Sequence, residues 1–136
     1  MNIHEKLPTD LKAIPALIRD VAAKLRELPI DKGQLHDVRL CLEEALVNAI
    51  KHGNKFNPNL FVEVDIESDG NSLSISVADQ GEGFDFQGIP DPRNPDNLHK
   101  LSGRGILLIR SHMDSVDFFD SGRTIKMTKL FKGRGK

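Results

Sequence analysis

Cysteine is nearly absent from this chain of 136 residues, in which Cys41 is the one thiol. A single cysteine excludes an intramolecular disulfide, and its place in a helical pattern indicates a small packing residue rather than a nucleophile. Long apolar runs are also missing. None approaches the ~18 residues of a membrane span, and no apolar stretch flanked by positive charge begins the chain. The sequence therefore predicts a cytoplasmic protein with no signal peptide and no membrane partner.

Neither sign of charge is in excess. Nineteen Lys and Arg oppose twenty Asp and Glu, which gives a net charge of −1. This balance lacks the basic footprint of a protein that binds nucleic acid, and the basic end after Phe131 is interpreted as a solvated tail. The length suits a single domain, 1–136, with a sizeable core, and no repeat or internal boundary interrupts it.

Several common site motifs are missing as well. The sequence has no G-x-x-x-x-G-K-[ST] phosphate loop and no G-x-G-x-x-G dinucleotide fingerprint. His4, His36, His99 and His112 show no metal-ligand spacing with one another or with Cys41, so they are interpreted as surface or capping residues. A functional site has to be sought in other patterns.

The apolar periodicity predicts three helices and about five strands. The first half should hold a weak edge strand over residues 1–7, a helix from Leu11 that Thr9 or Asp10 caps and Pro29 ends, and a turn at 31–33. A second helix should run from Gln34 to His52 and stop at Gly53, followed by a hairpin over 61–77 that turns at 69–71. A third helix should open at Gly103, followed by a strand around 116–119 and a last strand over 124–131. The irregular stretch 85–102 holds three prolines, which predicts a functional loop such as a lid.

The second helix carries Glu44, Asn48 and His52 at four-residue spacing, which puts them on one face, opposite an apolar stripe. An amide oxygen such as that of Asn48 suits Mg²⁺, which takes its remaining oxygens from water and phosphates. The Glu44 carboxylate can accept a proton from a water or a hydroxyl. Taken alone, such a pair is more often a solvated helix surface.

A second motif, Asp79-x-Gly81-x-Gly83, ends the second strand of the hairpin. A carboxylate only accepts hydrogen bonds, so it suits the exocyclic amine of adenine and rejects the carbonyl of guanine at that position. The glycines let the backbone approach a flat base closely. Alone, the motif is more often an ordinary glycine turn, and it lacks the further carboxylates of an EF-hand.

A third motif, Gly103-Arg104-Gly105, opens the third helix. Unpaired N–H groups and the helix dipole attract phosphate at such a start, and Arg104 can add a charge-assisted contact. A flexible hinge is the equal alternative for this motif on its own.

Together and in this order, the motifs resemble the Bergerat (GHKL) ATP-binding fold of gyrases, histidine kinases and related ATPases. Within it, the chain resembles the small anti-sigma factor serine kinases of bacteria. Four stretches carry the resemblance, which spans nearly the whole chain: E-E-A-L-V-N-A-I-K-H-G, D-Q-G-E-G-F-D, G-R-G-I-L-L-I-R-S-H-M-D-S-V and G-R-T-I-K-M. The resemblance implies an α+β fold, a two-layer sandwich with a mostly antiparallel sheet of about five strands and three helices on one face.

The resemblance also implies roles for individual residues. Glu44 would be the base that deprotonates the attacking hydroxyl, and Asn48 the Mg²⁺ ligand. The residues that would contact ATP or ADP are Asn48, His52, Asp79, Gly81, Gly83, Lys100, Gly103, Arg104, Gly105 and Thr124. Relatives often carry an arginine shortly before the third helix, where this chain has Lys100, Leu101 and Ser102, so Lys100 or Arg104 would take its place.

The function implied is that of an ATP-dependent serine/threonine-protein kinase in a partner-switching circuit. Its substrate would be a small STAS-type anti-sigma factor antagonist, and its second partner a sigma factor or another regulator, with a possible homodimer. The alternative is an ATP-binding module that sequesters such a regulator without phosphotransfer. A sensor histidine kinase and a gyrase- or chaperone-type ATPase are disfavoured, because the sequence shows neither a dimerisation helix pair nor a transducer domain.

Overall fold

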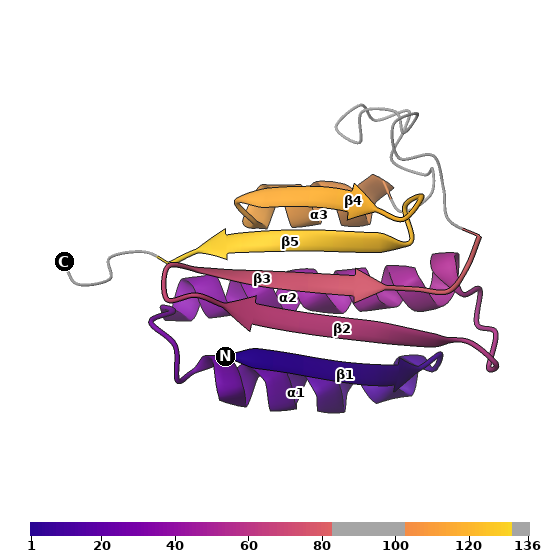
Figure 1. Ribbon diagram of the computed structural model, residues 1–136, viewed down its shortest axis with the longest axis horizontal. Coiled ribbons are helices and arrows are strands. Elements are labelled where there is room, and N and C mark those ends of the chain that lie inside the picture. The colour runs from indigo at the N-terminus through magenta and orange to yellow at the C-terminus, as the bar shows by residue number, and fades with distance from the viewer. Residues whose placement is uncertain (83–102, 132–136) are drawn as a thin grey trace.

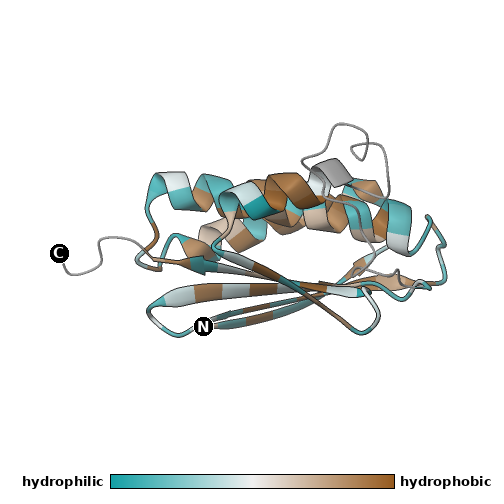
Figure 2. Cartoon of the chain, turned by 90° about the horizontal axis from the view of Figure 1, so that it is seen from above, coloured by the Kyte–Doolittle hydropathy of each residue, from teal (hydrophilic) through white to brown (hydrophobic). Residues whose placement is uncertain are grey.

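The computed structural model describes residues 1–82 and 103–131, and within them five strands form one sheet covered by three α-helices (Figure 1). The strands are β1 (Asn2–Pro8), β2 (Phe61–Ser68), β3 (Ser72–Ala78), β4 (Ser115–Phe119) and β5 (Thr124–Leu130). The helices are α1 (Ile14–Leu25), α2 (Lys32–Asn48) and α3 (Gly103–His112). All three helices lie on the same face of the sheet (Figure 2), so the expected two-layer α+β sandwich is confirmed.

The sheet has the strand order β1-β2-β3-β5-β4, and every neighbouring pair is antiparallel. The weak N-terminal strand is therefore present as an edge. One cross-strand row faces the helices and is buried: Ile3, Ile66, Ile75 and Met127 lie side by side, each next to its partner in the register. The alternation of apolar and polar residues seen in the sequence thus sets which face of the sheet forms the core.

The first α-helix begins later and ends earlier than its periodicity suggests. Asp10 caps a short 3₁₀ turn, Leu11–Ala13, and the α-helix follows with Pro15 in its first turn. It ends at Leu25 rather than at Pro29. A proline restricts the residue before it, so the chain leaves helical geometry ahead of the proline itself.

The predicted turn at 31–33 is wrong. The Asp31 carboxylate accepts a hydrogen bond from Gln34 N at 2.7 Å and caps α2, which begins at Lys32. Asp-Lys-Gly reads as a turn locally, but an aspartate one turn ahead of an apolar stripe is also an N-cap. The helix therefore begins two residues, about half a turn, before the expected start at Gln34.

The end of this helix also differs from the prediction. After Asn48 the chain makes a π-helical turn, Ala49–Gly53, and Gly53 is not in the left-handed region. That region is occupied instead by Lys55 (φ 51°) and Phe56 (φ 61°). A stop by Gly53 at this position is therefore wrong, and the contacts that Gly53 makes, described below, explain why a glycine is present.

Two predictions fall outside the described residues: the loop over 85–102 and the basic tail after Phe131. In the part of the chain that is described, no helix combines the length and apolar character needed to cross a bilayer.

Candidate functional site

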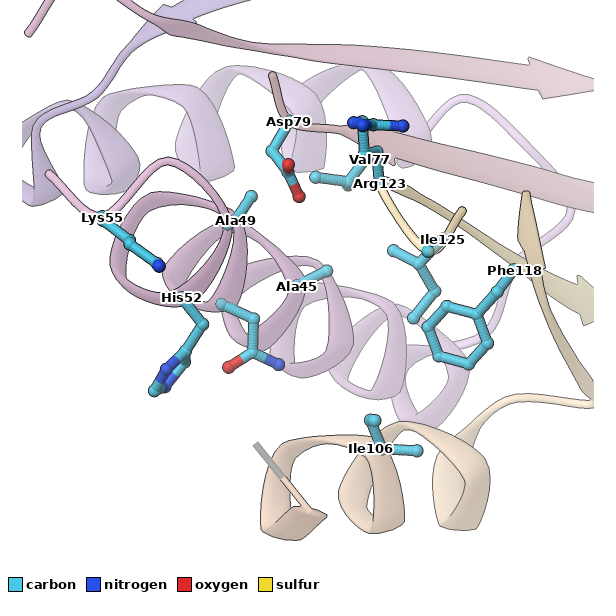
Figure 3. Close-up of a pocket in the computed structure, with 13 residues that line it drawn as sticks. Ala45, Ala49, His52, Lys55, Val77, Asp79, Ile106, Phe118, Arg123 and Ile125 are labelled. Atoms are coloured by element: carbon cyan, nitrogen blue, oxygen red, sulfur yellow. The ribbon is translucent and has the colours of Figure 1, made fainter. Parts of the chain in front are cut away.

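A cavity of about 220 Å³ opens between the end of α2, the end of β3, the start of β5 and the start of α3 (Figure 3). Its walls are mostly apolar, and its polar side chains come from both layers. The lining residues are Ala45, Asn48, Ala49, His52, Gly53, Lys55, Val77, Asp79, Ile106, Phe118, Gly122, Arg123 and Ile125. A mostly apolar pocket with a few convergent polar groups is the usual form of a small-molecule site.

The last residue of α2, Asn48, and His52 in the π-helical turn that follows both line this cavity. Glu44, one turn earlier, does not line the cavity but lies beside it, under the first turn of α3. A Cβ built on Gly105 would come within 2.7 Å of both Asn48 Nδ2 and Glu44 Oε2. The structure therefore brings the acid–amide pair and Gly105 into direct contact, and only a glycine allows α3 to approach this closely.

Asp79 follows directly after β3 and points into the cavity (Figure 3). Its Oδ1 accepts a hydrogen bond from Gly81 N at 2.9 Å, and its own N–H donates to Arg123 O at 2.9 Å. Burial raises the pKa of Asp79 above its ordinary value, while the Gly81 N–H and the charge of Arg123 act in the lowering direction and Asp120 again raises it. Asp79 is thus a partly desolvated acceptor facing the cavity.

Two glycines make room for Asp79. A Cβ on Gly53 would lie 2.3 Å from Asp79 Oδ2, and a Cβ on Gly81 would lie 1.9 Å from Gly53 O. The π-turn after α2 and the segment after β3 therefore meet backbone to backbone. The sequence marks Gly81 as a site residue, but it gives no local signal that Gly53 has a related role.

The mouth of the cavity holds a further pair that the sequence motifs do not single out. Lys55 Nζ lies 3.5 Å from Glu82 Oε2, and both side chains are largely exposed. Lys55 also has positive φ, a strained conformation for a lysine that tends to occur at functional sites. Such an exposed ion pair contributes little to stability.

The other predicted site residues are only partly placed together. Gly103 and Arg104 form the start of α3 next to Gly105, whereas Gly83 and Lys100 lie outside the described residues. Thr124 begins β5 opposite Ala78, the residue before Asp79, but it is not among the residues lining the cavity.

The apolar walls come from residues that no sequence motif singles out for the site. Val77 and Ile125 are cross-strand partners, and Phe118 pairs with Ile125 on its other side, so the three form one row at the cavity end of the sheet. Their strand parity puts them on the helix face, which is the signal that could have identified them.

Cys41 is buried, as its helical position predicts, and its burial raises the pKa of the thiol to about 12. A thiol that stays protonated is a poor nucleophile and metal ligand. Among residues 1–82 and 103–131 no cluster of three or more His, Cys, Asp or Glu could hold a metal ion. A divalent cation at Asn48 would therefore need oxygens from a ligand and water, as Mg²⁺ commonly has in phosphate sites.

Fold and site together define an ATPase domain of the GHKL type: helices on one face of an antiparallel sheet, with an acid–amide helix and a glycine-flanked aspartate meeting at one cavity. The family described as the histidine kinase-like ATPase domain matches residues 7–129. Over 106 residues the chain is 33% identical to the serine-protein kinase RsbW of Staphylococcus aureus strains Newman and USA300, an alignment that covers 72% of this chain and 67% of each relative.

Among solved structures, the chain resembles the crystal structure of the RsbU and RsbW domains of Rv1364c from Mycobacterium tuberculosis, with a TM-score of 0.61 and 16% identity. The match covers 96% of this chain and 32% of that one, so the chain spans about a third of that protein, and the likeness shows the fold. The chain belongs to the histidine kinase-like ATPase family, in the group of the anti-sigma factor serine kinases.

Proposed function

We propose that the protein is an ATP-dependent serine/threonine-protein kinase that phosphorylates a small STAS-type antagonist and, when free of it, holds a sigma factor or another regulator. The observation that carries this proposal is the cavity itself, into which Asn48 and Asp79 face from opposite layers. Kinship with the serine-protein kinases RsbW supports it.

Asp79 would recognise the base. Its carboxylate accepts the hydrogen bond that the exocyclic amine of adenine donates, and Gly53 and Gly81 let the backbone come close. Ala49 and Ile106 line the same cavity and supply apolar surface for a flat ring. At about 220 Å³ the cavity is smaller than most small-molecule sites, roughly 300–1,000 Å³, which suits a base better than a whole nucleotide.

The phosphates would then lie toward the first turn of α3, where backbone N–H groups are free of intrahelical partners. Asn48 lines the cavity and also lies against this turn, and its amide oxygen would be the protein ligand of Mg²⁺. Bound Mg²⁺ and ATP supply the transferable phosphoryl group, and the protein positions the reactants and neutralises charge. Glu44 would take the proton of the serine or threonine hydroxyl.

Calorimetric titration with ATP, ADP and GTP in the presence of Mg²⁺ tests the binding half of this proposal. We expect ATP and ADP to bind and GTP to be rejected, because a carboxylate cannot pair with the guanine carbonyl. Asn48→Ala should weaken ATP binding in Mg²⁺ more than in EDTA. A chain that binds no adenine nucleotide would refute the function.

Transfer of labelled phosphate from ATP to a candidate antagonist protein tests the kinase half. Glu44→Ala should leave ADP affinity nearly unchanged and lower the transfer rate by about 10²-fold or more, the usual contribution of a general base. Glu43→Ala is the matched control, since Glu43 is the exposed neighbour on the same helix. Pull-downs with and without ATP would then identify the regulated partner and show whether a second copy of the chain is captured.

One observation favours the alternative, a nucleotide-gated binding module without phosphotransfer. Glu44 is covered by the first turn of α3 at Gly105 and does not reach the cavity. Phosphotransfer would require this turn to move away from Glu44 to admit a hydroxyl. Wild-type protein that binds ATP and its partner but transfers no label would establish the alternative.

A further inference from the structure

Arg123 contacts the segment after β3 more extensively than any sequence motif suggests. Its Nε donates to Gly81 O at 2.7 Å, and one terminal nitrogen donates to Glu82 O at 3.2 Å. The other terminal nitrogen donates to Asp120 O at 3.2 Å. One planar guanidinium therefore joins the β4–β5 turn to the two residues that follow Asp79 and Gln80.

The backbone of Arg123 holds the same segment a second time, because Arg123 O accepts the N–H of Asp79 at 2.9 Å. The turn that delivers Arg123 is unusual. Asp120 (φ 53°), Ser121 (φ 57°) and Gly122 (φ 84°) are all left-handed, and two of these are not glycine. Strain of this kind persists where surrounding contacts over-determine it, and it clusters at ligand sites.

Charge adds to this geometry. Arg123 and Asp120 act on Asp79 from the β4–β5 turn. His52, in the π-helical turn after α2, and Lys55, just beyond that turn, line the cavity. Of the two turn residues, Arg123 favours the carboxylate form of Asp79 and Asp120 opposes it. Burial alone would favour the neutral acid, which is the wrong form to accept two hydrogen bonds.

We propose that Arg123 is a positioning residue for nucleotide recognition: it fixes the Asp79–Glu82 segment in the conformation that receives adenine and carries a positive charge near the Asp79 carboxylate. The inference rests on the proposed function, in which Asp79 accepts a hydrogen bond from the adenine amine. Arg123 itself need not touch the nucleotide.

The test combines two measurements on Arg123→Gln, Arg123→Lys and the control Arg39→Gln, an exposed arginine on α2 outside the cavity lining. Carbon-13 NMR of the Asp79 carboxyl, without nucleotide, follows its ionisation. Calorimetry with ADP at several pH values follows binding. We expect Arg123→Gln to raise the pKa of Asp79 and to weaken ADP binding roughly tenfold through the lost hydrogen bonds.

Arg123→Lys separates charge from hydrogen bonding, because lysine keeps the charge but not the planar guanidinium that donates to three carbonyl oxygens. It should leave the ionisation of Asp79 near that of the wild type while still weakening ADP binding. Asp120→Asn should shift the pKa of Asp79 in the opposite direction, downward. This variant keeps the electrostatic half testable if Arg123→Gln fails to fold.

The outcomes are distinguishable. If the wild type binds ADP, and Arg123→Gln binds it equally well with an unchanged Asp79 titration, the inference is overturned and the proposed function stands. If the wild type binds no ADP at all, the proposed function falls and the inference falls with it. Equal effects in Arg123→Gln and Arg39→Gln would also overturn it, since a site-specific role predicts none in the control.

Discussion

At the scale of single residues, glycine is decisive where the two layers touch. Gly53→Ala places a methyl group 2.3 Å from Asp79 Oδ2, so the π-turn and the segment after β3 have to separate. We expect loss of measurable ADP binding by calorimetry together with a lower melting temperature.

Gly33→Ala provides the matched control for that substitution. A Cβ on Gly33 meets nothing closer than 3.4 Å, and Gly33 lies in the first turn of α2. Alanine there should leave ADP binding intact and stabilise the fold by up to about 1 kcal/mol, because glycine is the poorer helix former. Equal tolerance of alanine at both glycines would contradict the packing seen at Gly53.

The protonation state of Asp79 should make ADP affinity depend on pH. The carboxylate is the form that accepts the adenine amine, and burial raises the pKa of Asp79 above its ordinary value. ADP affinity should therefore fall as the pH drops through this raised pKa, that is, at less acidic pH than for an exposed aspartate. Asp79→Asn should weaken binding by about 1–3 kcal/mol at neutral pH.

The same substitution supplies the check on that assignment. In Asp79→Asn the acidic loss of affinity should disappear, because an amide does not titrate in this range. Calorimetric titrations from pH 4 to pH 8, on protein shown by circular dichroism to stay folded, would measure both effects. A variant with the wild-type pH profile would assign the titration to another group.

At the scale of elements, the buried side chain of Asn54 holds the loop after the π-turn. Its Nδ2 donates to Thr9 Oγ1 and to Phe61 O, each at 3.1 Å, and its Oδ1 accepts from Gln80 N at 2.8 Å. One amide thus connects the ends of β1, β2 and β3. Asn54→Ala should lower the free energy of unfolding by about 2–3 kcal/mol, because it leaves buried polar groups unpaired.

Urea denaturation of Asn54→Ala beside Asn59→Ala, an exposed asparagine in the same loop, would measure this cost. ADP binding should weaken as well, since Gln80 adjoins Asp79. If the two variants unfold at the same urea concentration, the network contributes no more than an ordinary surface residue.

The comparison of sequence and structure separates local from tertiary information. The alternation of Leu73, Ile75 and Val77 with serines is contained in one strand, so β3 and its buried face follow from the sequence. Gly53 and Arg123 act through contacts with Asp79 and Gly81, which lie far away along the chain. No local pattern encodes such contacts, so the sequence predicts a helix stop at Gly53 and assigns no role to Arg123.

At the scale of the whole molecule, one buried ion pair joins the layers at the end away from the cavity. Lys129 on β5 is almost fully buried, and its Nζ lies 3.1 Å from Asp37 Oδ2 on α2 and donates to His112 O at the end of α3. Removing one partner leaves the other charge desolvated. Asp37→Ala should therefore cost about 2–3 kcal/mol, less than for a fully buried pair because Asp37 is partly exposed.

The double variant Asp37→Leu with Lys129→Met tests whether the cost comes from an unpaired charge. Replacing both partners by apolar side chains of similar volume should recover most of the stability in denaturant titrations. If the double variant is as unstable as Asp37→Ala, the ion pair contributes more than the mutual neutralisation of its two charges. The attachment of α3 then depends on Lys129.

The cavity described above has walls that belong to both layers: Ala45 and Ala49 from the helices, Val77 and Ile125 from the sheet. It therefore lies between the two layers at one end of the core and opens to solvent beside Lys55. A ligand bound in the cavity contacts both layers, so the packing between the helices and the sheet is better in the bound protein than in the free protein. By mass action the resistance of this protein to unfolding would then rise and fall with the cell's supply of nucleotide.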